Sequence, residues 1–131
     1  MSRRELTTFT AAIAIAIAFA APALAAAGDM NVATFLAKAD ALKSQGAMAM
    51  FSGDIDVLKG EGKAAAESYK ARLLKERAAG HPSSCPPQGT GINTDELLGH
   101  LRSYPANVRP RVSMKQAMAD FFIRKYPCRK P

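Results

Sequence analysis

The two cysteines are the residues of this chain best suited to chemistry, and each stands beside proline. Cys85 lies in the stretch HPSSCPPQGT, and Cys128 lies in the closing stretch KYPCRKP, 43 positions further on (128 minus 85). So long a spacing matches neither a C-x-x-C redox motif nor a zinc motif. The residues leave three interpretations: a disulfide between the two sulfurs, a metal site completed by His81 or His100, and a reactive thiol.

The N-terminal segment bears on this choice because it indicates a compartment. Two arginines occur in the first four residues, residues 9–21 are apolar or small, and residues 23–25 (Ala-Leu-Ala) have the small-x-small pattern that signal peptidases accept. We therefore expect residues 1–25 to be a cleaved signal peptide, with cleavage after Ala27 as the second choice. An uncleaved anchor is the alternative, but no apolar run reaches the ~20 residues that a membrane span needs. The expected location is the periplasm, with no membrane span.

Export favours the disulfide over the other two interpretations. In an oxidising compartment two thiols of a small domain usually pair, whereas cytosolic cysteines more often serve metal or redox chemistry. A bridge from Cys85 to Cys128 would add about 4 kcal/mol of stability, because the loop that it closes is long. We therefore predict a structural disulfide, no metal and no cofactor.

The remaining polar residues do not form a catalytic pattern. His81 precedes proline in a loop, and His100 shares a helical face with Glu96. Such histidines are more often buried or solvated than general bases. Asp54 and Asp56 flank the start of a predicted helix, where carboxylates usually act on the helix dipole. The sequence therefore predicts a protein that is not an enzyme and has no catalytic residues.

The chain is basic. Its 18 Lys and Arg residues against 11 Asp and Glu residues give a net charge of +7 at pH 7, and loss of residues 1–25 from the 131 would leave 106 residues with a charge of +6. Nucleic acid is not an expected partner, because no base-reading module or aromatic interleaving accompanies the charge. A solvated basic face or an acidic partner remains. The basic residues gather in three groups: Lys70, Arg72, Lys75 and Arg77; Arg109 and Arg111; Arg124, Lys125, Arg129 and Lys130.

Four segments have the apolar period of an amphipathic helix: residues 30–46, 52–80, 93–105 and 113–126. Each begins with a residue suited to capping, and glycine or proline stands at or just beyond each end. The expected N-caps are Asn31, Ser52 or Asp54, Asn93 and Ser113. Gly60 and Gly62 lie inside the second helix, where we expect either a kink or another backbone packed closely against them.

These helices predict an all-α, small four-helix bundle-like domain over residues 26–131. Residues 81–91 are expected to form a loop, because three prolines and two glycines occur there. No segment alternates for long enough to predict a strand. The disulfide would tie the loop after the second helix to the tail after the fourth. The expected core residues are Phe35, Leu36, Ile55, Leu58, Leu73, Leu97, Leu101, Phe121 and Phe122.

The segment from Cys85 to Cys128 has a recognisable order of features. A Cys-x-Pro turn is followed by a helix that ends in LRSYP, a polar linker, and a last helix that closes on a Pro-Cys pair. In this order it resembles the C-terminal half of the Tai-type immunity proteins, while residues 31–50 have no clear counterpart there. The matching positions are Cys85, Pro87, Leu97, Leu101, Pro105, Ala117, Phe121, Pro127 and Cys128.

This resemblance implies a small exported helical protein that neutralises a peptidoglycan amidase toxin of type VI secretion by blocking the active-site cleft. We expect the loop from Tyr104 to Arg111 to contact the amidase, with Tyr104, Asn107, Arg109 and Arg111 as partner-binding residues. A homodimer is also expected, because so small a domain gains from association. The alternatives are a periplasmic stress chaperone and an envelope-associated structural module without an enzyme partner.

Overall fold

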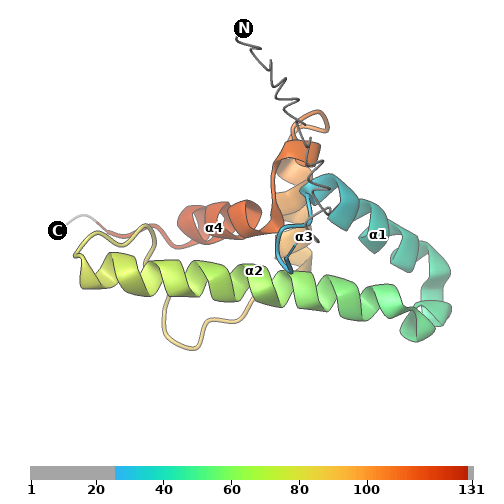
Figure 1. The fold of residues 1–131 in the computed structure, drawn as a ribbon, viewed down its shortest axis with the longest axis horizontal. Helices are drawn as coiled ribbons and strands as arrows, with labels where there is room; N and C mark the ends of the chain where they lie inside the picture. The colour runs from blue at the N-terminus through green and yellow to red at the C-terminus, as the bar shows by residue number, and fades with distance from the viewer. Residues whose placement is uncertain (1–25, 130–131) are drawn as a thin grey trace, which may run out of the picture.

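The computed structural model describes residues 26–129 (Figure 1). The signal peptide predicted for residues 1–25 and the basic residue Lys130 lie outside the described residues. Every regular element in the described range is helical, which confirms the all-α prediction. In chain order the elements are α1 (Val32–Gln45), the 3₁₀ turn η1 (Gly46–Phe51), α2 (Gly53–Ala78), α3 (Thr94–Ser103), the 3₁₀ turn η2 (Arg109–Arg111) and α4 (Met114–Lys125).

All four α-helices begin at a predicted N-cap. The side-chain oxygens of Asn31, Ser52, Asn93 and Ser113 each accept a hydrogen bond from a backbone N–H two or three residues further on, at 2.8–3.3 Å. These bonds satisfy N–H groups that have no partner inside the helix, which is why each helix begins there. Of the two candidates for α2, Ser52 is the cap, and Asp54 lies in the first turn and pairs with Lys38 at 2.9 Å.

The starts of α1 and α4 lie next to each other. Asn31 and Ser113 form an antiparallel bridge, the only extended pairing in residues 26–129. The preceding segment is held on α2, because a carboxylate oxygen of Glu61 accepts hydrogen bonds from the N–H groups of Gly28 and Met30, at 2.7 and 3.3 Å. Helices that are far apart in the sequence are therefore joined at one corner of the molecule.

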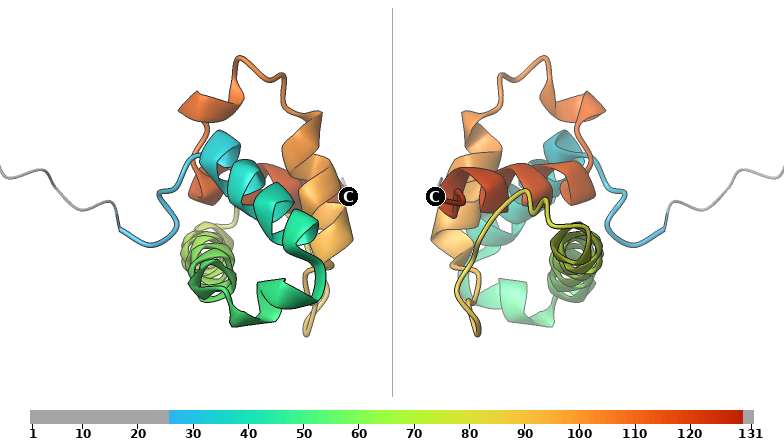
Figure 2. Two further views of the ribbon diagram at one scale, coloured as in Figure 1. Left: turned by 90° about the vertical axis from the view of Figure 1, so that its right-hand side faces the viewer. Right: turned by 90° about the vertical axis from the view of Figure 1, so that its left-hand side faces the viewer.

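Helix α2 is the spine of the fold. It runs as one helix of 26 residues, and α1, α3 and α4 lie on one side of it (Figures 1 and 2). The close backbone contact expected at Gly60 and Gly62 is absent, because a Cβ at either position would meet no atom within 4 Å. Both glycines lie inside one continuous helix. They therefore affect the fold only through their low helix propensity.

The core lies between α2 and the other three helices. Of the predicted core residues, Phe35, Leu36, Leu97, Leu101 and Phe121 belong to the main buried cluster, and Leu58 and Phe122 pack against it. Leu73 lies in a smaller cluster with Tyr69 and Ala119. Ile55 is only half-buried and belongs to neither cluster. The main cluster also contains four residues on the apolar faces that periodicity predicts, Val32, Ala65, Ala117 and Met118, and two that periodicity did not select, Val112 and Met114.

The predicted disulfide is present. Cys85 and Cys128 are bonded, with their Cα atoms 4.9 Å apart. Both sulfurs are used in this bond, so neither the metal-ligand nor the reactive-thiol interpretation applies to them. The bridge fastens the loop after α2 to the tail after α4, and the backbone N–H of Cys85 also donates to the carbonyl of Tyr126 at 2.8 Å.

Candidate binding surfaces

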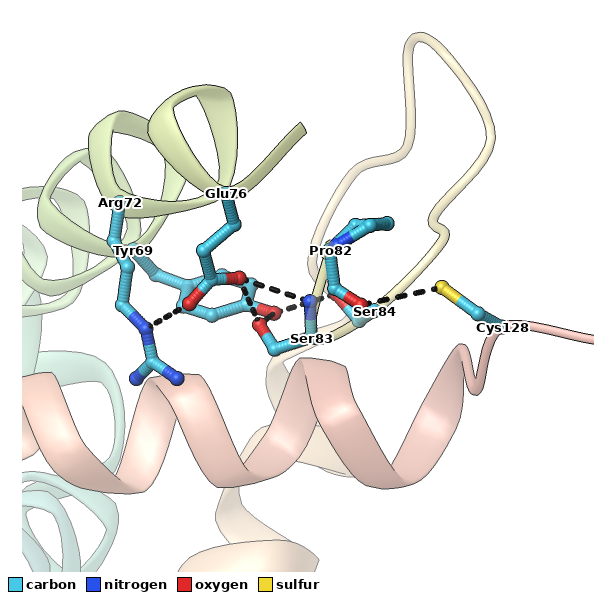
Figure 3. Close-up of polar contacts among 7 residues, drawn as sticks. All are labelled: Tyr69, Arg72, Glu76, Pro82, Ser83, Ser84 and Cys128. Atoms are coloured by element: carbon cyan, nitrogen blue, oxygen red, sulfur yellow. Dashed lines mark hydrogen bonds and ion pairs between the residues drawn. The ribbon is translucent and has the colours of Figure 1, made fainter. Parts of the chain in front are cut away.

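Residues 81–92, which connect α2 to α3, are here named the elbow. Two serines hold the elbow on α2: the hydroxyl oxygen of Tyr69 lies 2.5 Å from Ser84 Oγ and 2.9 Å from Ser83 Oγ (Figure 3). Tyr69 is 4 % exposed and Ser84 is fully buried. Because a buried hydroxyl left without a partner is costly, these bonds fix the elbow against the helix.

Glu76 fastens the same segment from the last part of α2. One carboxylate oxygen accepts from the backbone N–H and the hydroxyl of Ser83, at 2.9 and 2.5 Å, and the other accepts from Arg72 at 2.6 Å. The hydroxyl of Ser83, followed by Arg72, lowers the pKa of Glu76 to about 2. The carboxylate is therefore ionised at neutral pH and remains an acceptor for all three donors.

The tail of the chain approaches this network through the disulfide. Cys128 Sγ lies 3.7 Å from the carbonyl oxygen of Pro82 (Figure 3). A disulfide sulfur carries no hydrogen, so this approach is a contact and not a hydrogen bond. The elbow is thus held by side-chain hydrogen bonds to α2, by a backbone hydrogen bond and by a covalent link.

A groove of about 550 Å³ lies between α2 and the elbow, here named the α2–elbow groove. Its apolar lining comes mainly from Tyr69, Leu73, Leu74, Ile92 and Phe122. Polar side chains at its border include Lys70 and Arg77 of α2 and Gln88 and Thr90 of the elbow. A groove of this size with a mostly apolar lining is typical of a binding site. The sequence indicated the two basic residues but not the groove, because the path of the elbow along α2 depends on bonds such as those of Ser83 and Ser84 to Tyr69, 14 and 15 positions away.

Residues 104–111, which follow α3, include η2 and contain the predicted partner-binding residues, are here named the arch. Figure 2 shows the arch at the end of the molecule farthest from α2. Asn107 and Arg111 are exposed. Arg109 donates to the carbonyl oxygens of Tyr104 and Arg102, at 2.9 and 2.8 Å, and the exposed Arg111 makes one longer bond, 3.5 Å, to the carbonyl oxygen of Asn107. Two of the four predicted residues are therefore open to a partner, and Arg109 holds the arch in shape.

Tyr104 belongs to a hydrogen-bonded group beneath the arch. Its hydroxyl donates to Asp120 at 2.5 Å and lies 3.3 Å from His100 Nε2. The same nitrogen lies 3.0 Å from the carbonyl oxygen of Ala117, which only accepts, so Nε2 carries a hydrogen. Burial is the main cause that lowers the pKa of His100, and burial followed by Asp120 raises the pKa of Tyr104.

This hydrogen-bonded group stabilises the packing of α3 on α4. His100 is 8 % exposed and packs edge-on against Phe121 and Tyr104. Its neutral form is favoured, and the Nε2 hydrogen is directed at a backbone carbonyl. Of the two predicted roles for His100, buried or solvated, the structure shows the buried one. The other histidine, His81, is exposed at the start of the elbow.

The most exposed apolar side chains form the turn between α1 and α2, here named the tip. Met48, Met50 and Phe51 of η1 are 68, 80 and 85 % exposed. The apolar period does not predict the 3₁₀ turn in this stretch, GAMAMF, which contains no polar side chain. Three large apolar residues within four positions at a corner of the molecule make a concentrated apolar surface.

Residues 26–129 contain neither a metal-binding cluster nor a membrane-spanning helix. No cluster of three or more His, Cys, Asp or Glu side chains suits a metal ion there. None of the helices in that range combines the length and the apolar character that crossing a membrane requires. No family model, curated protein or solved structure matches this chain.

Proposed function

We propose that this protein is an exported, non-enzymatic binding protein that inhibits a peptidoglycan amidase by placing the arch in the active-site cleft of that enzyme. The resemblance of residues 85–128 to Tai-type immunity proteins supports this proposal. The disulfide supports an oxidising compartment, and the periplasm is the compartment proposed.

The shape and fixed structure of the arch carry the proposal. A segment that enters a cleft must project from the body, and the arch does so (Figure 2). Ordering a mobile loop upon binding costs free energy, whereas a loop already ordered avoids that cost. The hydrogen bonds of Arg109 to two carbonyl oxygens, and of Tyr104 to Asp120, order the arch before any partner arrives.

The exposed residues of the arch would make the contact. Asn107 and Arg111 present an amide and a guanidinium to solvent, and Pro105 and Pro110 are exposed as well. The fixed φ of proline limits the conformations available to this segment. In this proposal Tyr104 and Arg109 act as positioning residues.

An inhibition assay tests the proposal. Purified protein with its disulfide formed is added to peptidoglycan amidases, beginning with any amidase encoded beside its gene, and the release of cleaved peptide is measured. We expect inhibition at equimolar protein, and we expect Arg111→Glu to weaken it. Lys59→Glu is the matched control, because Lys59 is an exposed basic residue of α2 far along the chain from the arch.

Two results would contradict the proposal. One is the absence of both binding and inhibition across the amidases. The other is equal inhibition by the Arg111→Glu and Lys59→Glu variants, which would place the interface outside the arch.

The tip supports a second candidate function, a periplasmic chaperone. Exposed methionine and phenylalanine side chains adapt to varied apolar segments of unfolded proteins. In that case the protein would suppress the aggregation of a reduced or acid-unfolded client, and Phe51→Ser would reduce the effect. The tip also supports the proposed homodimer, whose signature is a sedimentation coefficient that rises with concentration and falls in the Phe51→Ser variant.

A further inference from the structure

We propose that the α2–elbow groove binds an acidic amphipathic helix of a partner protein. This site differs from the arch and goes beyond the proposed inhibition of an amidase. The inference rests on the apolar lining of the groove, on two basic side chains at its border, and on the fixed position of its walls.

The basic residues at the border are available to an acidic partner. Lys70 and Arg77 form no ion pair with any residue in the described range. Glu67, which also lines the groove, lies 3.9 Å from Lys63 on the preceding turn, and this pair is exposed. The local charge at the groove is therefore positive, which favours a partner with carboxylates.

The spacing of the charges indicates the shape of the partner. Lys70 and Arg77 are seven residues apart on α2, which corresponds to two turns and about 10.5 Å along the axis. Leu73 and Leu74 lie between them, and Leu74 is 58 % exposed although it lines the groove. A helix laid along α2 reproduces this pattern when it has acidic residues at i and i+7 and apolar residues at i+3 and i+4.

The walls of the groove are fixed before binding. Tyr69, which lines the groove, is itself bonded to Ser84 of the elbow. The elbow wall turns at Gln88 and Gly89, where Gly89 has a φ of +74° and the N–H of Thr90 donates to the carbonyl of Pro87 at 3.3 Å. Because glycine adopts this φ without strain, the turn is stable, and a partner meets a preformed groove.

A small amphiphilic acid is the main competing occupant. An acyl chain would suit the apolar lining, but its single head group would pair with one of the two basic residues and leave the other beside its tail. Two carboxylates separated by apolar side chains match Lys70, Leu74 and Arg77 together. The acidic helix is therefore the occupant that the charge pattern favours.

A synthetic peptide tests the site directly. The probe is a fluorescently labelled helix of about 15 residues, near the length at which isolated helices begin to be stable, with glutamate at i and i+7 and leucine at i+3 and i+4. Binding to the full chain with its disulfide formed is measured by fluorescence anisotropy, and backbone amide shifts of isotope-labelled protein show the location. We expect saturable binding that weakens with added salt, with shifts at residues 66–77 and 86–92.

Matched variants separate specific binding from general adhesion. Leu74→Ala is expected to weaken the affinity about tenfold because it removes apolar contact, and Lys70→Glu with Arg77→Glu is expected to weaken it by about the same factor. The controls are Val57→Ala and Lys59→Glu, which change an exposed apolar residue and an exposed basic residue of α2 outside the groove. Both controls are expected to keep the affinity of the unchanged protein.

Several outcomes would overturn the inference: no saturable binding, equal binding of a peptide with lysine in place of glutamate, or unchanged affinity in the groove variants. Binding of laurate at the groove without binding of the peptide would assign the site to an amphiphilic acid instead. None of these outcomes affects inhibition through the arch, because Leu74→Ala leaves the arch intact. The failure of this inference and the failure of the proposed function are therefore distinguishable.

Discussion

Removal of the disulfide is expected to lower the free energy of unfolding by a large amount. Cys85 and Cys128 close a loop with a sequence separation of 43. Chain entropy gives such a loop about 4 kcal/mol at 25 °C, because the bond restricts the unfolded chain far more than the folded one. Small domains have a total stability of roughly 5–15 kcal/mol, so this is a large share.

The folded state is expected to survive the change. Cys85 is exposed and Cys128 is half-buried, so replacing both with serine leaves no large cavity. The bonds of Ser83 and Ser84 to Glu76 and Tyr69 still hold the elbow on α2. The lost stability therefore comes mainly from the greater conformational freedom of the unfolded chain.

Urea unfolding followed by far-UV circular dichroism measures this effect. The Cys85→Ser/Cys128→Ser variant is expected to lose about 4 kcal/mol relative to the oxidised protein, and each single variant is expected to lose nearly as much, because either change removes the bond. A double variant within about 1 kcal/mol of the unchanged protein, or single losses that add, would refute the entropic reasoning.

Three further predictions concern groups that donate or ionise in the folded protein. Tyr104→Phe removes the hydroxyl that donates to the half-buried Asp120, so urea unfolding is expected to show a loss of about 1–3 kcal/mol; unchanged stability would mean that this bond has no net effect. Burial lowers the pKa of His100, so stability is expected to fall as pH drops below the unfolded-state pKa of about 6.5. His100→Gln is expected to flatten that slope between about pH 7 and 5, and a variant with the original slope would contradict the assignment. The pKa of Glu76 is lowered from 4.5 to about 2, first by the hydroxyl of Ser83, so its contribution to stability is complete above about pH 4.5 and is lost toward pH 2. Glu76→Gln is expected to reduce the pH dependence in that window, and an unaltered profile would argue against the role of this carboxylate.

The helices could be predicted from the sequence because their boundaries are set locally. Asn31, Ser52, Asn93 and Ser113 each cap a helix through a bond to a residue only two or three positions away. The disulfide could also be predicted, because the N-terminal segment indicates export to an oxidising compartment, where the two cysteines have only one intramolecular pairing. Neither conclusion required knowledge of how the helices pack.

The surfaces could be predicted less well because they depend on contacts between distant segments. Tyr104 was expected to face a partner, but Asp120, 16 positions away, binds its hydroxyl. Composition would place Met50 and Phe51 in a core, whereas the short turn between α1 and α2 leaves them exposed. The α2–elbow groove depends on contacts between segments that are apart in the sequence, such as Tyr69 with Ser84, 15 positions away, so no local pattern indicates it.

The most direct test of the account is hydrogen exchange of the complex with an amidase that this protein inhibits. Mass spectrometry would compare amide protection in the protein alone and in the complex. We predict new protection at residues 104–111, with little change at the tip, Gly46–Phe51. Protection confined to the tip or the elbow, with the arch exchanging as in the isolated protein, would contradict the claim that the arch enters the enzyme.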